Sequence, residues 1–321
     1  MTLRFGRAPG VWLSLMLIAP WSAATPVGLR FDDEFSSLSL HRTWRPGDHW
    51  QLIAPDSTDG RGGPAWNEAG SQWWVNPCNP YTPISGVYSL VDGKLKLSIL
   101  PTPSAYQAYI DRGSGKHLPY VGALLNTSKT DYQKFGYYEV SASVDRVPGF
   151  SFQADTENVQ VSGHWPPEID LNIYTDASNV QFVTFKVNVS KSANLSYTLS
   201  SSDGFDASVT HTYAWDWQSD YISLYIDGAQ VWRTANPGGV YKTDKQFLYL
   251  VTYANHLGRV DPNSASLPAY AHLDYVRIYQ NKPAASGSHH DAAVINRPRR
   301  NFVHTNPAQS GVSSRAMCQF S

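Results

Sequence analysis

The chain has 321 residues, enough for one large domain or two small ones, and an all-β sandwich can use more than about 200 residues as one unit. Its formal charge is −1 and its pI is near 6.8, so nothing in the charge favours nucleic acid or an anionic membrane as a partner. Aromatic residues make up 13% and charged residues 16%, a composition that suits a sugar-binding cleft and equally an ordinary β-sandwich.

Residues 1–24 have the pattern of a secretory signal peptide. Arg4 and Arg7 precede an apolar run at 11–19, and Ser22-Ala23-Ala24 supplies small residues for cleavage. The apolar run is shorter than the roughly 20 residues that span a bilayer. We expect cleavage near Ala24, a secreted or periplasmic protein, and no membrane span.

From residue 28 to residue 280 the sequence reads as short β-rich runs separated by Gly, Pro, Asn, Asp and Ser. Residues 94–99 alternate between polar and apolar side chains. Residues 221–226 are followed by Asp227-Gly228 and then by residues 229–232, which predicts a hairpin. No long apolar stripe with helical spacing appears, so we expect a single all-β sandwich over 28–280.

Residues 168–173 alternate strictly, so a strand here places Glu168, Asp170 and Asn172 on one face and apolar side chains on the other. Carboxylates at alternate positions of a strand lie about 6 to 7 Å apart along it. A retaining glycosidase uses two carboxyl groups about 5 to 5.5 Å apart. The alternation by itself is equally typical of a strand whose acidic residues face water.

Residues 282–321 differ in composition from the preceding domain. Pro, Ala, Ser, Gly, His and Asn dominate, and the basic residues outnumber the acidic ones. Such a segment buries too little apolar surface to offset its ordering entropy, so we expect a disordered polar and basic tail. Cys78 and Cys318 are the two cysteines of the chain, which excludes a disulfide framework and leaves a single bridge open.

Five separated motifs resemble, in the same order, those of glycoside hydrolase family 16, the family of bacterial lichenases and laminarinases. They are Phe31-Asp32-Asp33-Glu34-Phe35, residues 122–140, Trp165-Pro166-Pro167-Glu168-Ile169-Asp170, residues 204–228, and residues 273–279. The resemblance implies a concanavalin-like β-jelly roll of two curved antiparallel sheets with a glycan cleft across the concave sheet.

The resemblance also implies roles for single residues. Glu168 matches the family's nucleophile, and Asp170 matches the acid that assists it. Trp165 would stack on a sugar near the cleavage point, and Trp73 and Trp74 would provide further sugar platforms. The implied activity is hydrolysis of O-glycosidic bonds in a β-glucan or related polysaccharide, by a monomeric enzyme that needs no cofactor.

The resemblance also concerns a structural calcium site and the acid/base position of the family. Glu34 and Asp274 match residues that hold a structural calcium ion in many members of the family. At the position where the family carries its acid/base glutamate, this chain has Asn172, whose amide does not titrate. This difference favours an alternative function, a catalytically impaired protein that binds glycans.

A substitute proton donor would have to come from another part of the sequence. The nearest candidates along the chain are Asp155, Glu157, His164 and Asp176. Their spacing does not distinguish among them, and the sequence leaves the choice open.

Overall fold

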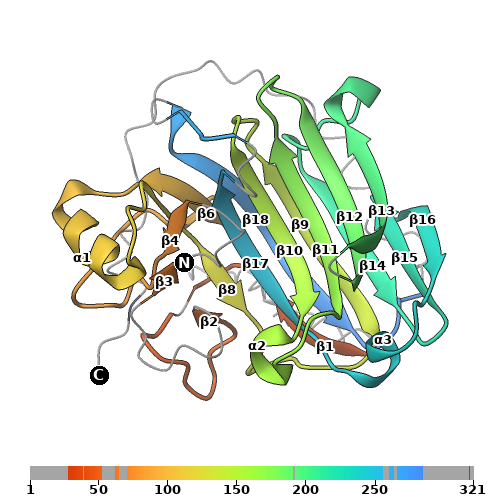
Figure 1. Ribbon diagram of the computed structural model, residues 1–321. Coiled ribbons are helices and arrows are strands. Elements are labelled where there is room, and N and C mark those ends of the chain that lie inside the picture. Colours follow the sequence, from red (N-terminus) through yellow and green to blue (C-terminus); the bar gives the residue numbers. More distant parts are fainter. Residues whose placement is uncertain are drawn as a thin grey trace, which may run out of the picture.

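The computed structural model describes residues 28–38, 40–52, 62–64, 71–190, 192–255, 260–263, 266–284 and 318. In this part of the chain the strands form two sheets that lie face to face, with almost all neighbours antiparallel (Figure 1). This confirms the predicted two-sheet jelly roll. The predicted signal peptide and most of the predicted tail lie outside the described residues. None of the described helices has the length and apolar character needed to cross a membrane.

The smaller sheet has seven strands, and its central strands carry the acidic motif. Its order across the sheet is β13 (Ala193–Ser200), β12 (Gln181–Ser190), β11 (Glu168–Thr175), β10 (Phe150–Glu157), β17 (Phe247–Ala254), β8 (Leu124–Asn126) and β2 (Gln51–Leu52).

The larger sheet has eleven strands and forms the second layer. Its order is β16 (Ala229–Ala235), β15 (Tyr221–Ile226), β14 (His211–Trp217), β9 (Gly136–Val144), β18 (Ala269–Tyr279), β6 (Lys94–Pro101), β7 (Tyr120–Gly122), β4 (Gln72–Trp74) and β3 (Gly63–Pro64). Two further strands pair at its side, β1 (Leu29–Asp33) with β18 and β5 (Tyr88–Val91) with β6.

The main core lies between the two sheets and follows the alternation of their strands. Ile169, Leu171 and Ile173 of β11 point into it, as expected from the alternating sequence. Trp215 and Trp217 of β14 are buried in the same cluster. A fully buried apolar side chain stabilises the fold by about 1.5 to 3 kcal/mol, so this interface holds the two sheets together.

The predicted hairpin and the predicted strand at 94–99 are both present. Asp227 and Gly228 connect β15 to β16 with positive φ angles of 50° and 77°, as a tight two-residue hairpin turn requires. The sequence reading missed helix α1 (Ser104–Ser114), which buries mainly Ile110 and therefore has only a short apolar stripe. The other helices are the single turns α2 (Val159–Ser162) and α3 (Val240–Thr243) and the 3₁₀ turn η1 (Ser201–Asp203).

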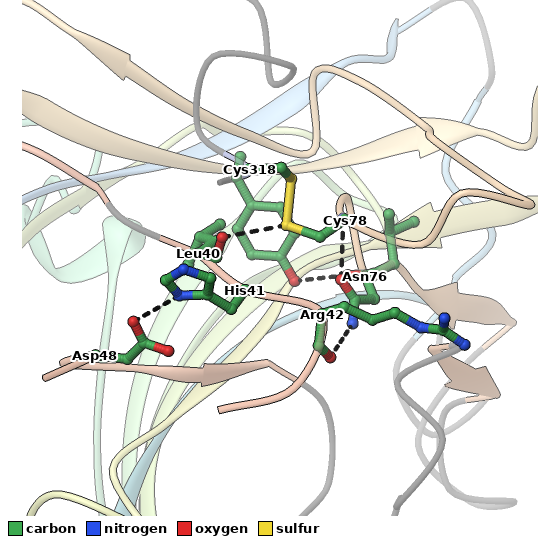
Figure 2. The surroundings of a disulfide bond; sticks show 9 residues. Leu40, His41, Arg42, Asp48, Asn76, Cys78 and Cys318 are labelled. Atoms are coloured by element: carbon green, nitrogen blue, oxygen red, sulfur yellow. Dashed lines mark hydrogen bonds and ion pairs between the residues drawn. A yellow bond between two sulfur atoms is a disulfide. The ribbon is translucent and has the colours of Figure 1, made fainter. Parts of the chain in front are cut away.

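A disulfide joins Cys78 to Cys318, two residues separated by 240 positions (Figure 2). Cys318 also pairs with Leu40 in a short parallel bridge, and the Cys78 backbone N–H donates to the Asn76 side chain at 3.0 Å. The sequence left this pairing open. The structure therefore fastens one residue of the predicted disordered tail to the N-terminal part of the domain.

Candidate functional site

The acidic motif lies on the face of the smaller sheet that points away from the core. Strand β11 pairs with β10 and with β12 without a register shift, so it contains no bulge. Glu168, Asp170 and Asn172 therefore share one face, as predicted, and Ile173 points to the core. The same register places Asp155 of β10 and Lys186 of β12 on either side of Asp170.

Three carboxyl groups meet at this point: those of Asp155, Glu168 and Asp170. One oxygen from each lies within 4.8 Å of the others. Glu168 is half-buried, whereas Asp170 and Asp155 are only 8% and 6% exposed. The structure thus adds a third acid to the pair that the motif predicts.

Glu168 accepts two hydrogen bonds through the same oxygen. Trp165 Nε1 and Asn188 Nδ2 each donate to Glu168 Oε2 at 2.7 Å, and the Asn188 amide also donates to Asp170 Oδ2 at 3.0 Å. Hydrogen bonds to an ionised group stabilise its charge more than neutral hydrogen bonds do. These donors therefore favour a negatively charged Glu168.

Tyr241, on α3, holds the start of β11 in place. The Glu168 backbone N–H donates to the Tyr241 hydroxyl oxygen at 3.0 Å. The same hydroxyl lies 2.6 Å from the Glu168 carbonyl and 2.7 Å from the Asn188 carbonyl, both acceptors for its proton. Sequence reasoning missed Tyr241 and Asn188, because each comes from an element distant in sequence and neither belongs to a recognisable motif.

Burial separates the protonation states of the three acids. It raises the pKa of Glu168, but the hydrogen bonds from Trp165 and Asn188 oppose that rise. Burial raises the pKa of Asp170 and of Asp155 well above the usual range, and the negative charge of their neighbours raises both further. These shifts favour ionisation of Glu168 over ionisation of Asp170 and Asp155.

The side chain of Asn172 is buried by its neighbours. Its side chain is 1% exposed, and its Oδ1 accepts a hydrogen bond from Ser151 Oγ at 3.3 Å. An amide in this position cannot donate a proton and later recover it.

The structure distinguishes the four candidate proton donors. Asp155 lies in the carboxyl cluster, and Glu157 is the cross-strand neighbour of Glu168. His164 is bound by Asp244 through Nε2 at 3.0 Å and directs its Nδ1 at the Pro166 carbonyl. Asp176 accepts backbone hydrogen bonds within the turn after β11.

The three tryptophans predicted to bind sugar differ in their surroundings. Trp165 is half-buried and lies beside Glu168. Trp73 is 4% exposed and packs against Tyr109 of α1, and Trp74 is 2% exposed and packs against Tyr253. This packing supports a sugar-binding role for Trp165 and not for the other two, whose role as platforms stays a prediction.

The open part of the sheet face lies over β12 and β13. Lys186 is half-buried, and Ser196 and Thr198 are exposed beside it. By contrast, Tyr249 and Tyr253 of β17 are buried in an apolar cluster with Trp74. Hydroxyl and ammonium groups on the open side match the hydrogen-bonding character of a glycan.

The predicted calcium residues are each neutralised by a cationic side chain. Glu34 pairs with Arg277 through two contacts of 2.7 and 3.1 Å, and Asp274 lies 2.8 Å from Lys94 Nζ. These ion pairs provide the charge compensation that a calcium ion would supply. The calcium site stays a prediction.

The carboxyl cluster is itself compact enough to ligate a cation. However, the N–H groups of Trp165 and Asn188 already point at its oxygens and stabilise its negative charge.

Comparisons with known proteins agree with this fold and motif. The sequence model of the glycosyl hydrolases family 16 matches residues 94–253. A β-glucanase of Paenibacillus polymyxa is 30% identical over 196 residues, which cover 59% of this chain and 72% of that protein. The endo-1,3-1,4-β-glycanase ExsH of Rhizobium meliloti is 24% identical over 256 residues, 78% of this chain and 51% of the relative.

The fold is likewise found among solved structures. The endo-β-1,3-glucanase of Pyrococcus furiosus superimposes with a TM-score of 0.62 at 16% identity, covering 80% of this chain and 95% of that one. The chain spans about half the length of the Rhizobium relatives that it matches.

Proposed function

Because the chain belongs to family 16 of the glycosyl hydrolases, we propose that it hydrolyses O-glycosidic bonds in a β-glucan or related polysaccharide, with retention at the anomeric carbon. The names of its relatives, β-glucanase and endo-1,3-1,4-β-glycanase, support glucans that contain β-1,3 and β-1,4 linkages as the first substrates to test. The nearly neutral net charge agrees with a neutral polymer.

The observation that carries this proposal is the environment of Glu168. A nucleophilic carboxylate must be ionised and reachable, and Glu168 is half-buried with two N–H donors directed at one oxygen. One of its oxygens would attack the anomeric carbon and form a glycosyl ester. Protonated Asp170, which shares the Asn188 amide with Glu168, would orient the nucleophile and keep a second negative charge away from it.

Asn172 favours a second candidate function, a protein that binds glycans without cleaving them. In this case Trp165 and the open polar face of β12 and β13 would hold the polysaccharide. Without general acid catalysis, worth about 10² to 10⁴-fold, a natural glycan with a poor leaving group would be cut slowly or not at all.

The test uses an activated substrate that needs no proton donor. Wild type, Glu168→Gln and the matched control Asp176→Asn are incubated with 2,4-dinitrophenyl β-cellobioside and with mixed-linkage β-glucan. We expect wild type and the control to release dinitrophenol. The rate of release by Glu168→Gln should be lower by at least about 10³-fold, because the nucleophile is gone.

Trapping the intermediate provides a second readout. The corresponding 2-deoxy-2-fluoro glycoside should label wild type covalently, and peptide mass spectrometry should place the label on Glu168. Release of dinitrophenol that does not depend on Glu168 rejects the proposal. Binding of β-glucan in affinity electrophoresis without any cleavage establishes the glycan-binding function instead.

We further propose that the protein is exported as a monomer. The signal-peptide pattern of residues 1–24 supports export, and so does the Cys78–Cys318 disulfide, because disulfides persist in oxidising compartments. Expression in a bacterium with an oxidising periplasm, followed by N-terminal sequencing and light scattering, tests both points. A mature protein that begins at Met1 would contradict export with cleavage of residues 1–24. A stable dimer would contradict the monomeric state.

A further inference from the structure

We propose that Asp155 donates and recovers the proton in the reaction at Glu168, in place of the acid that position 172 lacks. This inference rests on the proposed function, because it assigns a second catalytic residue to the same site.

The position of Asp155 fits this role. It lies directly across from Asp170 in the β10–β11 register, on the sheet face that carries Glu168. Its carboxyl oxygen lies within 4.8 Å of a Glu168 oxygen. Retaining glycosidases place their two carboxyl groups about 5 to 5.5 Å apart, so the pair Glu168 and Asp155 has nearly the required separation.

The contacts of Asp155 indicate an acid that holds its proton. It is 6% exposed, and its Oδ1 is buried without a hydrogen-bond partner in the described part of the chain. A buried carboxylate with one unsatisfied oxygen is disfavoured, and this favours the neutral acid. The groups that affect its titration are Asp170, Glu168 and Glu157 on the negative side and Lys186 on the positive side. Tyr249 lies across from Asp155 on β17, and the same strand carries Tyr253, whose pKa is raised by burial and by the charge of Asp155.

The proposed reaction proceeds in two balanced steps. In the first, a Glu168 oxygen forms a bond to the anomeric carbon, the bond from that carbon to the glycosidic oxygen breaks, and the Asp155 proton passes to the departing oxygen. In the second, the Asp155 carboxylate takes a proton from water, the water oxygen bonds to the anomeric carbon, and the ester bond to Glu168 breaks. Both side chains return to their starting states.

The leaving group provides the decisive test. In Asp155→Asn we expect hydrolysis of mixed-linkage β-glucan to fall about 10² to 10⁴-fold. The kcat/KM for 2,4-dinitrophenyl β-cellobioside should change only a few-fold, because this quantity reports the first step and dinitrophenolate leaves without a proton. Its kcat should fall, because Asp155 is also the base of the second step. The control Asp176→Asn should keep the wild-type ratio of the two rates. A purely structural role for Asp155 predicts equal losses on both substrates.

Azide provides an independent readout with Asp155→Ala. Azide attacks the glycosyl ester without needing a base, so it should accelerate turnover of the dinitrophenyl substrate and yield the β-configured cellobiosyl azide. Circular dichroism and thermal melting establish that each variant is folded. If Asp155→Ala is unfolded, the inference is decided by the Asp155→Asn variant, through its ratio of kcat/KM on β-glucan to kcat/KM on the dinitrophenyl substrate.

Two outcomes overturn the inference while leaving the proposed function intact. One is an Asp155→Asn variant whose kcat/KM falls by the same factor on both substrates, while Glu168→Gln still abolishes cleavage. The other is an Asn172→Glu variant that gains cleavage of β-glucan, because this gain means that position 172 is where the acid is missing. Failure of Glu168→Gln to abolish cleavage would instead reject the proposed function.

Discussion

Glu168 differs from its two acidic neighbours in the hydrogen bonds that it accepts. Trp165 and Asn188 both donate to its Oε2, whereas Asp155 Oδ1 and Asp170 Oδ1 are buried without a partner in the described structure. Donors lower the pKa of a carboxyl group and desolvation raises it. Asp170 Oδ2 accepts one hydrogen bond, from the same Asn188 amide. The difference therefore favours the negative charge on Glu168 and the protons on its neighbours.

The indole N–H of Trp165 provides a test at the scale of one hydrogen bond. Trp165→Phe keeps an aromatic ring but removes a donor that lowers the pKa of Glu168, so that pKa should rise. We expect the acidic limb of the pH profile of kcat/KM to move to higher pH and activity to fall about 10-fold, as for a hydrogen bond to a charged group. Trp232→Phe, at a half-buried position on β16, is the matched control. An unchanged acidic limb would contradict the assigned charge.

Asp155 should make stability depend on pH. Its pKa in the folded protein lies well above the usual 3.8, so the folded state binds this proton more tightly than the unfolded state. The resulting stabilisation is complete below pH 3.8 and is lost as pH rises through the raised pKa. Asp155→Asn removes the effect, so the variant should be more stable than wild type by about 1 to 3 kcal/mol at pH 8.

Urea denaturation at several pH values measures this difference. The advantage of Asp155→Asn at pH 8 should shrink towards pH 3.5, where wild type is protonated as well. An advantage that is equal at both pH values would show that Asp155 is not protonated specifically in the folded state.

Strand β11 and helix α3 act together to position Glu168, the proposed nucleophile. The strand contains no bulge, so its acidic side chains stay on one face, and the Tyr241 hydroxyl binds the backbone at its first residue. The same hydroxyl lies next to the Asn188 carbonyl near the end of β12. One side chain thus fixes the relative positions of Glu168 and of the Asn188 amide that donates to it.

Tyr241→Phe should loosen this arrangement. The Glu168 backbone N–H loses its partner, which destabilises a buried site by about 1 to 3 kcal/mol. We expect a lower melting temperature and lower kcat/KM, with the same loss on activated and natural substrates. Tyr213→Phe is the matched control, because the Tyr213 hydroxyl is buried without a partner in the described structure and its removal should be nearly neutral. Equal destabilisation by both variants would contradict the assigned role of the Tyr241 hydroxyl.

At the scale of the whole molecule, the disulfide connects two parts of the chain separated by 240 residues. Such a link restricts the unfolded chain most strongly when the closed loop is long. Cys78→Ser should therefore destabilise the protein by about 2 to 5 kcal/mol. We expect a melting temperature about 5 to 15 °C lower and unchanged kcat/KM at 25 °C, because the bridge lies outside the carboxyl cluster.

Differential scanning calorimetry and the dinitrophenyl assay measure the two effects. Reduction of wild type with dithiothreitol should reproduce the thermal effect of Cys78→Ser, and Cys318→Ser should match it. An equal melting temperature with and without the disulfide would contradict the expected stabilisation.

Much of this protein follows from its sequence alone. Period-two alternation set the strands and their faces, because side chains alternate across a pleated sheet, and the Asp227-Gly228 turn marked its hairpin. The spacing of Glu168 and Asp170 put both on one face for the same reason. Local geometry is sufficient for each of these features.

The rest depended on contacts between distant segments. Asp155, Asn188 and Tyr241 join Glu168 only because β10, β12 and α3 meet there in the folded chain, and no local pattern marks that meeting. The burial of Trp73 and Trp74 and the bond between Cys78 and Cys318 depend on packing in the same way. Sequence alone determined which side chains share a strand face, whereas tertiary structure decided which were desolvated and paired, and those conditions determine where a proton resides.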